Sequence, residues 1–271
     1  MPKMLLSKTK YLFLLAAAFG ALVVIPFAQS TSAQDLTGYE ILRFARIAHG
    51  GKEYEGLQYV TARAQGFVNM APVAGVGLGS GPAAAAVEVK LNLVDYQDAS
   101  TRRRLDVSAT NPAMAAMGPS FLVYTGTTGG GMYMGNEFRV SEATATRHWG
   151  LMGFATLNRA ADGNLNAVRQ KDVTEGGIKY YVVEVKFTAA DTVRYYIQQT
   201  NLMIGKVTTR YNSTPIVEEY RSDYRKVGCM WLPFHITTRL QGQRLADLDI
   251  DSYDLQTVVP AARFTMTVVA N

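Results

Sequence analysis

The sequence predicts a mainly β protein whose strands form an antiparallel sheet, with a helix near the N-terminus and a helical segment in the middle of the chain. From residue 167 onward, apolar and polar residues alternate with period two, and β-branched and aromatic residues are enriched. Turn residues such as Gly and Asn recur throughout this region. No helical pattern separates these strands, whereas a parallel sheet needs long crossover connections.

Residues 1–33 have the layout of a secretory signal peptide. Three lysines precede the apolar run 11–28, and the small residues Thr31 and Ala33 stand where a cleavage site before Gln34 requires them. The alternative is a retained membrane anchor formed by the apolar run, which is near the lower end of the length that spans a bilayer. We expect cleavage, and therefore an exported, periplasmic protein.

The remaining chain, residues 34–271, is expected to fold as a single domain, because no long Pro- or Ser-rich linker divides it. The sequence is 48% hydrophobic and only 18% charged, which excludes an intrinsically disordered protein. Without the three N-terminal lysines it carries 24 basic and 22 acidic residues, a net charge of +2. A nearly neutral body gives no reason to expect nucleic acid as a partner.

The first expected element is a helix that starts at a capping box. Thr37 and Glu40 have the spacing with which a Ser/Thr–Glu pair satisfies free backbone donors at a helix start. Gly50-Gly51 ends the helix, because glycine adopts the left-handed C-terminal conformation without strain. The apolar stripe between these signals consists of Ile41, Leu42, Phe44, Ala45, Ile47 and Ala48.

Strands and one helical segment follow. Residues 71–86 are a small-residue loop, and 127–131 form a second, glycine-rich loop between strands. Residues 141–161 interrupt the β pattern with Trp149, Met152 and neighbouring apolar residues at helical spacing. The strands expected before residue 167 are 59–70, 87–96, 101–107, 121–126 and 131–140.

The sequence predicts no catalytic residue, no metal site and no cofactor. Cys229 and His235 are six residues apart on one extended segment, so their side chains would be roughly 20 Å apart, too far for a dyad. Cys229 is expected to be a small core residue. The three histidines, His49, His148 and His235, lack metal-ligand spacing and are expected at surface or partly buried positions.

Two charged clusters are expected to be solvated. Asp247, Asp249, Asp251 and Asp254 could offer oxygens to calcium, but the Gly and Glu of the calcium-loop pattern are absent, which favours a solvated strand face. The basic run 102–104 is split by strand alternation and is expected at a solvated rim.

Several short stretches of the sequence form a recognisable set. They are His49-Gly50-Gly51, Thr192 to Ile197, Gly205-Lys206-Val207, Asp223-Tyr224-Arg225, Gly228, Trp231-Leu232-Pro233, Ile236, Asp251-Ser252-Tyr253 and Phe264. With these stretches the sequence resembles the superfamily of periplasmic lipoprotein carriers, the outer-membrane lipoprotein-sorting type, mainly over residues 178–264. The resemblance implies an unclosed, strongly curved antiparallel β-barrel, a half-barrel, in which an N-terminal helix and a midchain helical lid cover an apolar concave face.

Alternation along the expected strands gives the candidate groove-lining residues, and the helical patterns give the lid. The concave face is either an open apolar groove or a core filled by the two helical segments. The groove candidates are Tyr181, Val183, Val185, Phe187, Val193, Tyr195, Ile197, Phe234, Ile236, Leu248 and Ile250. The lid candidates are Ile41, Phe44, Trp149, Met152 and Phe154.

Three functions are compatible with these observations. The first is binding of a lipid acyl chain or a lipidated protein in the groove, under a movable lid. The second is a non-catalytic structural or interaction module of the cell envelope, with a filled groove and envelope partners. The third is a hydrolase, which the missing nucleophile and base disfavour.

Overall fold

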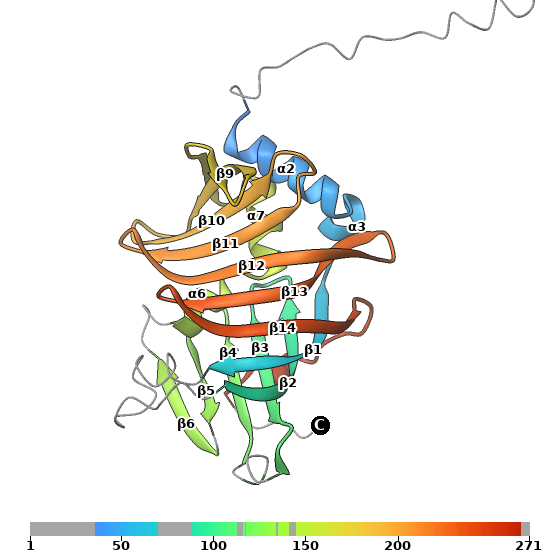
Figure 1. Ribbon diagram of the computed structural model, residues 1–271, viewed down its shortest axis with the longest axis vertical. Coiled ribbons are helices and arrows are strands. Elements are labelled where there is room, and N and C mark those ends of the chain that lie inside the picture. The colour runs from blue at the N-terminus through green and yellow to red at the C-terminus, as the bar shows by residue number, and fades with distance from the viewer. Residues whose placement is uncertain are drawn as a thin grey trace, which may run out of the picture. The chain divides into compact units, whose positions relative to one another are not determined.

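The computed structural model describes residues 36–69, 88–112, 116, 118–133, 135–140 and 145–266 (Figure 1). The expected signal peptide, the small-residue loop 71–86 and residues 141–144 lie outside the described residues. The remaining chain confirms a mainly β fold, in which one antiparallel sheet of 14 strands does not close into a barrel. Within the described residues, β6 and β7 are the two ends of this sheet, each paired on one side.

The sheet consists of two meanders, β1 to β6 and β9 to β14, which are joined where β1 pairs with β14. Its order is β6-β5-β4-β3-β2-β1-β14-β13-β12-β11-β10-β9-β7, and β8 also pairs with β9. The strands are β1 (Tyr59–Asn69), β2 (Glu88–Asp98), β3 (Arg103–Ala109), β4 (Ser120–Tyr124), β5 (Gly129–Tyr133), β6 (Asn136–Val140), β7 (Asn166–Arg169), β8 (Val173–Glu175), β9 (Ile178–Lys186), β10 (Asp191–Gln198), β11 (Ile204–Tyr211), β12 (Thr214–Val227), β13 (Met230–Leu240) and β14 (Gln243–Asp254).

The N-terminal helix α2 (Gly38–His49) forms as expected. The Thr37 side chain accepts a hydrogen bond from the Glu40 backbone, and the Glu40 carboxylate accepts one from the Thr37 backbone, which completes the capping box. Gly50 ends the helix with a φ of 144°. The short helix α3 (Lys52–Glu55) follows directly and was not predicted.

The glycine-rich segment 127–131 was expected to be a loop, but most of it is strand. The turn lies at residues 125–128, where Thr125 and Thr128 bond each other, and Gly129 already belongs to β5. A Cβ on Gly131 would lie 2.0 Å from the Phe121 carbonyl oxygen, so glycine is what allows β4 and β5 to approach. The expected two strands are therefore three, β4, β5 and β6.

The sheet curls strongly across its width. Glycine permits a close backbone approach at Gly66 of β1, where a Cβ would lie 2.1 Å from the Asp247 carbonyl oxygen. Register irregularities in several strand pairs add local twist. As a result, the Arg103 guanidinium on β3 lies 3.9 Å from the Glu219 carboxylate on β12, although β2, β1, β14 and β13 lie between these two strands. The face on which these side chains meet is the concave face.

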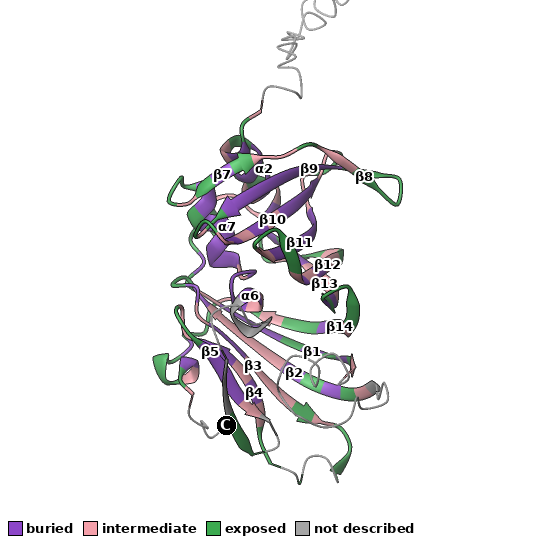
Figure 2. Cartoon of the chain, turned by 90° about the vertical axis from the view of Figure 1, so that its left-hand side faces the viewer, coloured by how far each residue is buried: buried purple, intermediate pink, exposed green. Residues whose placement is uncertain are grey.

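The midchain segment contains two helices, α6 (Ala145–Gly150) and α7 (Phe154–Ala161). With α2, they cover part of the concave face: α2 packs against β7, β9, β13 and α7, and α6 packs against β4, β5, β11 and β12. In Figure 2, β9, β10, β11 and α7 are largely buried, whereas β2 and β3 carry stretches of intermediate burial. The covered part forms a dense core whose fully buried side chains include Ile41, Leu42, Met152, Leu157, Val183, Tyr195, Ile197 and Ile204.

Candidate functional site

The groove candidates on β9 and β10 lie in the helix-covered core. Five of them have no exposed surface, Tyr181 is 8% exposed, and only Phe187 at the end of β9 is half-buried. The fully buried five are Val183, Val185, Val193, Tyr195 and Ile197. This half of the concave face is therefore filled by the protein's own helices.

The candidates on β13 and β14 lie in a different environment. Phe234, Ile236 and Leu248 are half-buried, and Ile250 is 7% exposed. They pack around a small buried cluster formed by Ala62, Ala64, Leu91, Leu93 and Ile250, against which further half-buried apolar side chains lie. We call the buried cluster together with the half-buried apolar side chains packed on it the apolar half-face. These half-buried side chains are Val68, Val89, Leu105, Val107, Ala109, Phe234, Ile236, Leu248 and Tyr253.

The contribution of β1, β2 and β3 to the apolar half-face was missed from the sequence. The signal was present, since Ala62, Ala64 and Val68 alternate with the exposed Arg63 and Gln65 along β1. Alanine is a weak marker of a covered strand face, so β1 was recognised as a strand without its face being assigned.

The lid candidates are anchored rather than loose. Ile41 and Met152 are fully buried, and Phe154 is 7% exposed. Trp149 is half-buried at the end of α6. Phe44 differs, because it lies on the outer flank of α2 with 41% of its surface exposed and does not face the sheet.

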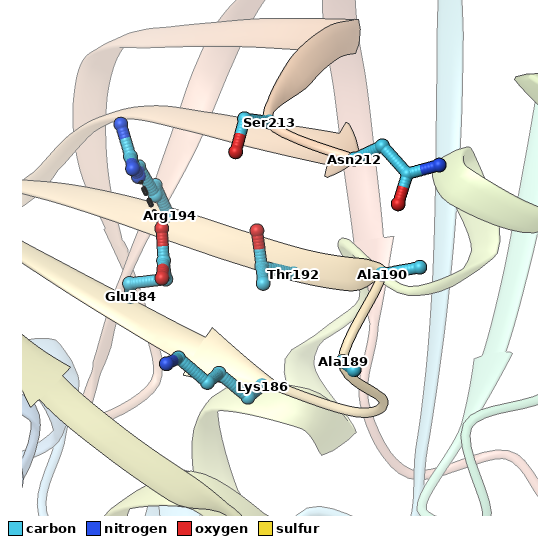
Figure 3. A pocket seen from close by; sticks show the side chains of 8 residues that line it. All are labelled: Glu184, Lys186, Ala189, Ala190, Thr192, Arg194, Asn212 and Ser213. Atoms are coloured by element: carbon cyan, nitrogen blue, oxygen red, sulfur yellow. Dashed lines mark hydrogen bonds and ion pairs between the residues drawn. The ribbon is translucent and has the colours of Figure 1, made fainter.

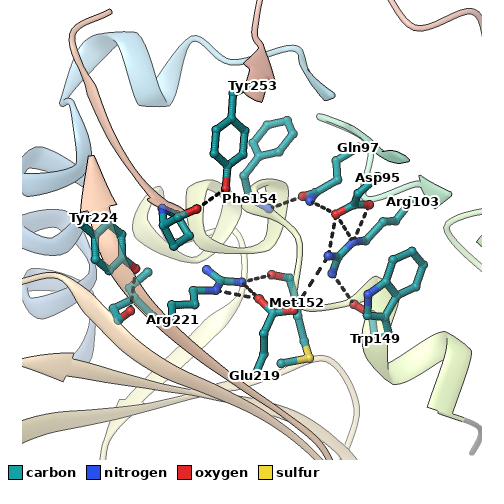
Figure 4. Close-up of polar contacts among 12 residues, drawn as sticks. Asp95, Gln97, Arg103, Trp149, Met152, Phe154, Glu219, Arg221, Tyr224 and Tyr253 are labelled. Atoms are coloured by element: carbon teal, nitrogen blue, oxygen red, sulfur yellow. Dashed lines mark hydrogen bonds and ion pairs between the residues drawn. The ribbon is translucent and has the colours of Figure 1, made fainter. Parts of the chain in front are cut away.

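Arg103 holds the end of α6 to β3 (Figure 4). Its guanidinium donates to the Asp95 carboxylate at 2.7 Å and to the Trp149 carbonyl oxygen at 3.1 Å. The same group lies 4.1 Å from the centre of the Trp149 ring, at the distance of a cation–π contact. A fixed positive charge at a helix C-terminus also interacts favourably with the helix dipole.

Arg221 on β12 makes the second attachment. It donates to the Glu219 carboxylate at 2.7 Å and to the Met152 carbonyl oxygen at 3.0 Å, while the Phe154 backbone donates to Gln97 at 3.1 Å. Burial alone would raise the pKa of Glu219, but the charges of Arg221 and Arg103 outweigh it and hold that pKa below its ordinary value. Asp95, Arg103, Glu219 and Arg221 thus form an ion quartet between the filled core and the apolar half-face, in which Arg103 and Glu219 are buried and Asp95 and Arg221 half-buried.

Two of the three histidines are buried, contrary to expectation. His49 is 3% exposed because its ring joins α2 to two strands: Nδ1 lies 2.9 Å from the Trp231 carbonyl oxygen, and Nε2 accepts from the Ile204 backbone at 3.3 Å. Burial lowers the pKa of His49 to about 4. His148 of α6 is fully buried, 3.8 Å from Asp191. His235 is half-buried, as expected.

The prediction of a solvated rim at residues 102–104 was wrong. Arg103 and Arg104 are 5% and 2% exposed, because each finds a carboxylate and an aromatic ring. Alternation does place them on opposite faces. Arg104 bonds Asp106, stacks 3.8 Å above Phe121 and donates to the Arg263 carbonyl oxygen, which fixes the 3₁₀ helix η2 (Ala261–Phe264) to the convex face.

The remaining polar candidates give no catalytic arrangement. Cys229 is exposed rather than in the core, because it follows Gly228 at the tip of the β12–β13 hairpin. Asp249, Asp251 and Asp254 are exposed, as expected for a solvated face, and Asp247 is half-buried beside His235. In the described part of the chain, no three His, Cys, Asp or Glu side chains are grouped so that they could hold a metal ion.

A polar depression of about 440 Å³ lies beside the turns that follow β9 and β11 (Figure 3). Glu184 and Arg194 pair across its wall at 2.6 Å. Thr192, Asn212 and Ser213 supply further polar groups, and Lys186 is exposed to solvent. The depression has no apolar lining comparable to that of the apolar half-face.

No helix among the described residues is long and apolar enough to cross a membrane. No protein-family model matches the sequence, and no curated protein matches it either.

Solved structures with a similar fold exist. A LolA superfamily protein from Nitrosomonas europaea superposes with a TM-score of 0.53 at 14% identity, covering 85% of this chain and 98% of its own. A domain described as an outer membrane lipoprotein-sorting protein, from Vibrio parahaemolyticus, gives a TM-score of 0.52 at 11% identity, covering 84% of this chain and 95% of its own. With its curled open sheet and its covering helices, the chain has the fold of the LolA superfamily, as the sequence resemblance implied.

Proposed function

We propose that this protein is an exported envelope protein that binds an acyl chain, either of a lipid or of a lipidated protein, on its apolar half-face. The observation that carries the proposal is the contiguous set of half-buried apolar side chains on β1, β2, β3, β13 and β14. Contiguous apolar surface on a concave face is typical of sites that take an apolar partner. The fold shared with a LolA superfamily protein and with a domain described as lipoprotein-sorting supports the same ligand class.

Binding would be driven by the removal of apolar surface from water, and it involves no covalent step. Each Å² of apolar surface removed from water stabilises the complex by about 25 cal/mol, before the cost of ordering the ligand is subtracted. The proposal involves no catalytic residue, no metal and no cofactor. It places the ligand on the apolar half-face and not beneath the helices, where Val185 and Ile197 belong to the filled core.

The proposal is tested with delipidated protein and a fluorescent fatty acid. Saturable uptake is expected for the wild type, and Leu248→Asp is expected to weaken it at least tenfold, because an unpaired carboxylate would enter the apolar wall. Phe67→Asp is the matched control: Phe67 is 46% exposed on β1, next to the residue that pairs with Leu248, and its side chain lies on the opposite face. Urea unfolding of each variant separates lost binding from lost folding.

A second candidate function is a non-catalytic structural or interaction module of the envelope. The filled half of the concave face favours it, since the helices there leave no room for a ligand. If folded, delipidated wild-type protein takes up no acyl probe, this second function replaces the first.

A further inference from the structure

We infer that the ion quartet is the inner end wall of the acyl site, so that a bound chain points its methyl end toward Arg103 and its polar head toward the far ends of β1, β2 and β3. The inference rests on the proposed function and adds to it the orientation of the ligand and the residues that limit its length.

The quartet closes the apolar half-face on the side of the helices. Arg103 from β3 and Glu219 from β12 approach to 3.9 Å across the concave face, and both are at most 5% exposed. The two arginines are already engaged by Asp95, Glu219 and the carbonyl oxygens of α6 and the turn after it. Separating buried charges that pair in this way is costly. The wall therefore stays closed to a methyl group, and its donors are not offered to a head group.

The opposite end of the apolar half-face suits a polar head. Val68, Val89 and Ala109 are half-buried there, and the polar residues Asn69 and Thr110 follow at the strand ends. A carboxylate or ester placed at this end stays hydrated, whereas at the inner end it would be buried without a partner. The tail-inward orientation is thus the one that leaves the fewest polar groups unsatisfied.

The distance between the two ends limits the chain that can be buried. On β1, Ala62 lies opposite Asp95 of the quartet, and Val68 lies opposite Val89 at the outer end. Six residues of strand separate Ala62 from Val68, which is roughly 20 Å. A palmitoyl chain is about as long. Affinity should therefore rise about fourfold for each added methylene until the chain reaches the wall, and then level off.

A chain-length series tests the wall. Saturated fatty acids from octanoic to stearic acid displace a fluorescent probe from wild type, Ala62→Leu and Ala109→Leu. Ala62→Leu adds volume next to the wall. It is therefore expected to lower the affinity for palmitic acid about tenfold and to change the affinity for octanoic acid less than twofold. The levelling point, which is the chain length beyond which affinity no longer rises, should move to shorter chains. Ala109→Leu, at the outer end, should leave the levelling point where it is.

Trp149 reports the orientation directly, because its ring lies against Arg103 of the wall. In a Trp231→Phe variant, Trp149 is the single tryptophan. Fatty acids brominated near the methyl end should quench its fluorescence strongly, and those brominated near the carboxyl group weakly.

Equal or reversed quenching, or an unchanged levelling point in folded Ala62→Leu, would overturn the inference while leaving acyl binding intact. If the wild type takes up no acyl chain at all, it is the proposed function that fails.

Discussion

At the scale of single residues, the polar groups of this protein matter most where they are buried. His49, Glu219 and Arg221 all lie between the helices and the sheet, and each contacts a segment that is far away in the sequence: His49 contacts Ile204, Glu219 contacts Arg103, and Arg221 bonds Met152. Burial also raises the pKa of Tyr54 to about 12, so this ring, which contacts His49, stays neutral at ordinary pH. Such residues couple the stability of the fold to the protonation of individual side chains.

His49 should make the protein less stable in acid. Its pKa is about 4 in the folded protein and near 6.5 when unfolded, so the unfolded chain binds the proton more tightly. The stabilisation is complete above pH 6.5 and is lost as the pH falls toward 4, by about 3 kcal/mol at most. Urea unfolding between pH 7.5 and pH 4 measures this loss.

In His49→Gln the neutral amide cannot titrate, so the pH dependence of the unfolding free energy should become flatter over this range. The same slope in the variant as in the wild type would show that other groups cause the acid sensitivity.

At the scale of elements, the attachment of the α6–α7 segment to the sheet depends on few polar contacts. The carbonyl oxygens of Trp149 and Met152 are bound by Arg103 and Arg221, and Glu219 is the carboxylate that bonds Arg221. Both arginines lie next to this carboxylate, and Asp95, which bonds Arg103, supplies the second negative charge that balances them. The segment is therefore held by an electrostatic arrangement as well as by its apolar side chains.

Glu219→Gln should destabilise the fold by about 3 kcal/mol or more, because removing one partner leaves a buried charge uncompensated. Asp223→Asn on the same strand is the control: its pair with Arg225 is half exposed, with side chains 46% and 60% accessible, so the loss should stay below about 1 kcal/mol. Chemical denaturation of both variants provides the comparison. Equal losses would mean that the quartet is no more important than a surface ion pair.

Local patterns predicted the elements well, whereas burial depended on distant partners. Alternation identified β9, β10 and β14, recurrent turn residues indicated further strands between them, and the capping box located the start of α2. Arg103 was placed at a solvated rim because its partners, Trp149 and Glu219, are remote in sequence. For the same reason, alternation showed which residues share the concave face but not which half of that face the helices cover.

At the scale of the whole molecule, the expected removal of residues 1–33 sets the form in which the protein would act. Intact-mass analysis of the protein recovered from the envelope should give a chain that begins at Gln34, since the basic start, the apolar run and the Thr31–Ala33 site form a cleavable signal. A recovered chain that retains Met1 would favour the membrane anchor instead.

The pairing of β1 with β14 has a consequence for when this protein can fold. Thr61 lies opposite Asp254, so a strand made early in synthesis must wait for one made near the end before the centre of the sheet exists. Closing so long a loop slows folding. During synthesis neighbouring strands can pair as they emerge, but the two runs of strands cannot be joined until β14 is made. For the export proposed above this delay would be an advantage, because a chain whose sheet cannot be completed before its last strand is made could be threaded across a membrane first and complete its fold on the far side.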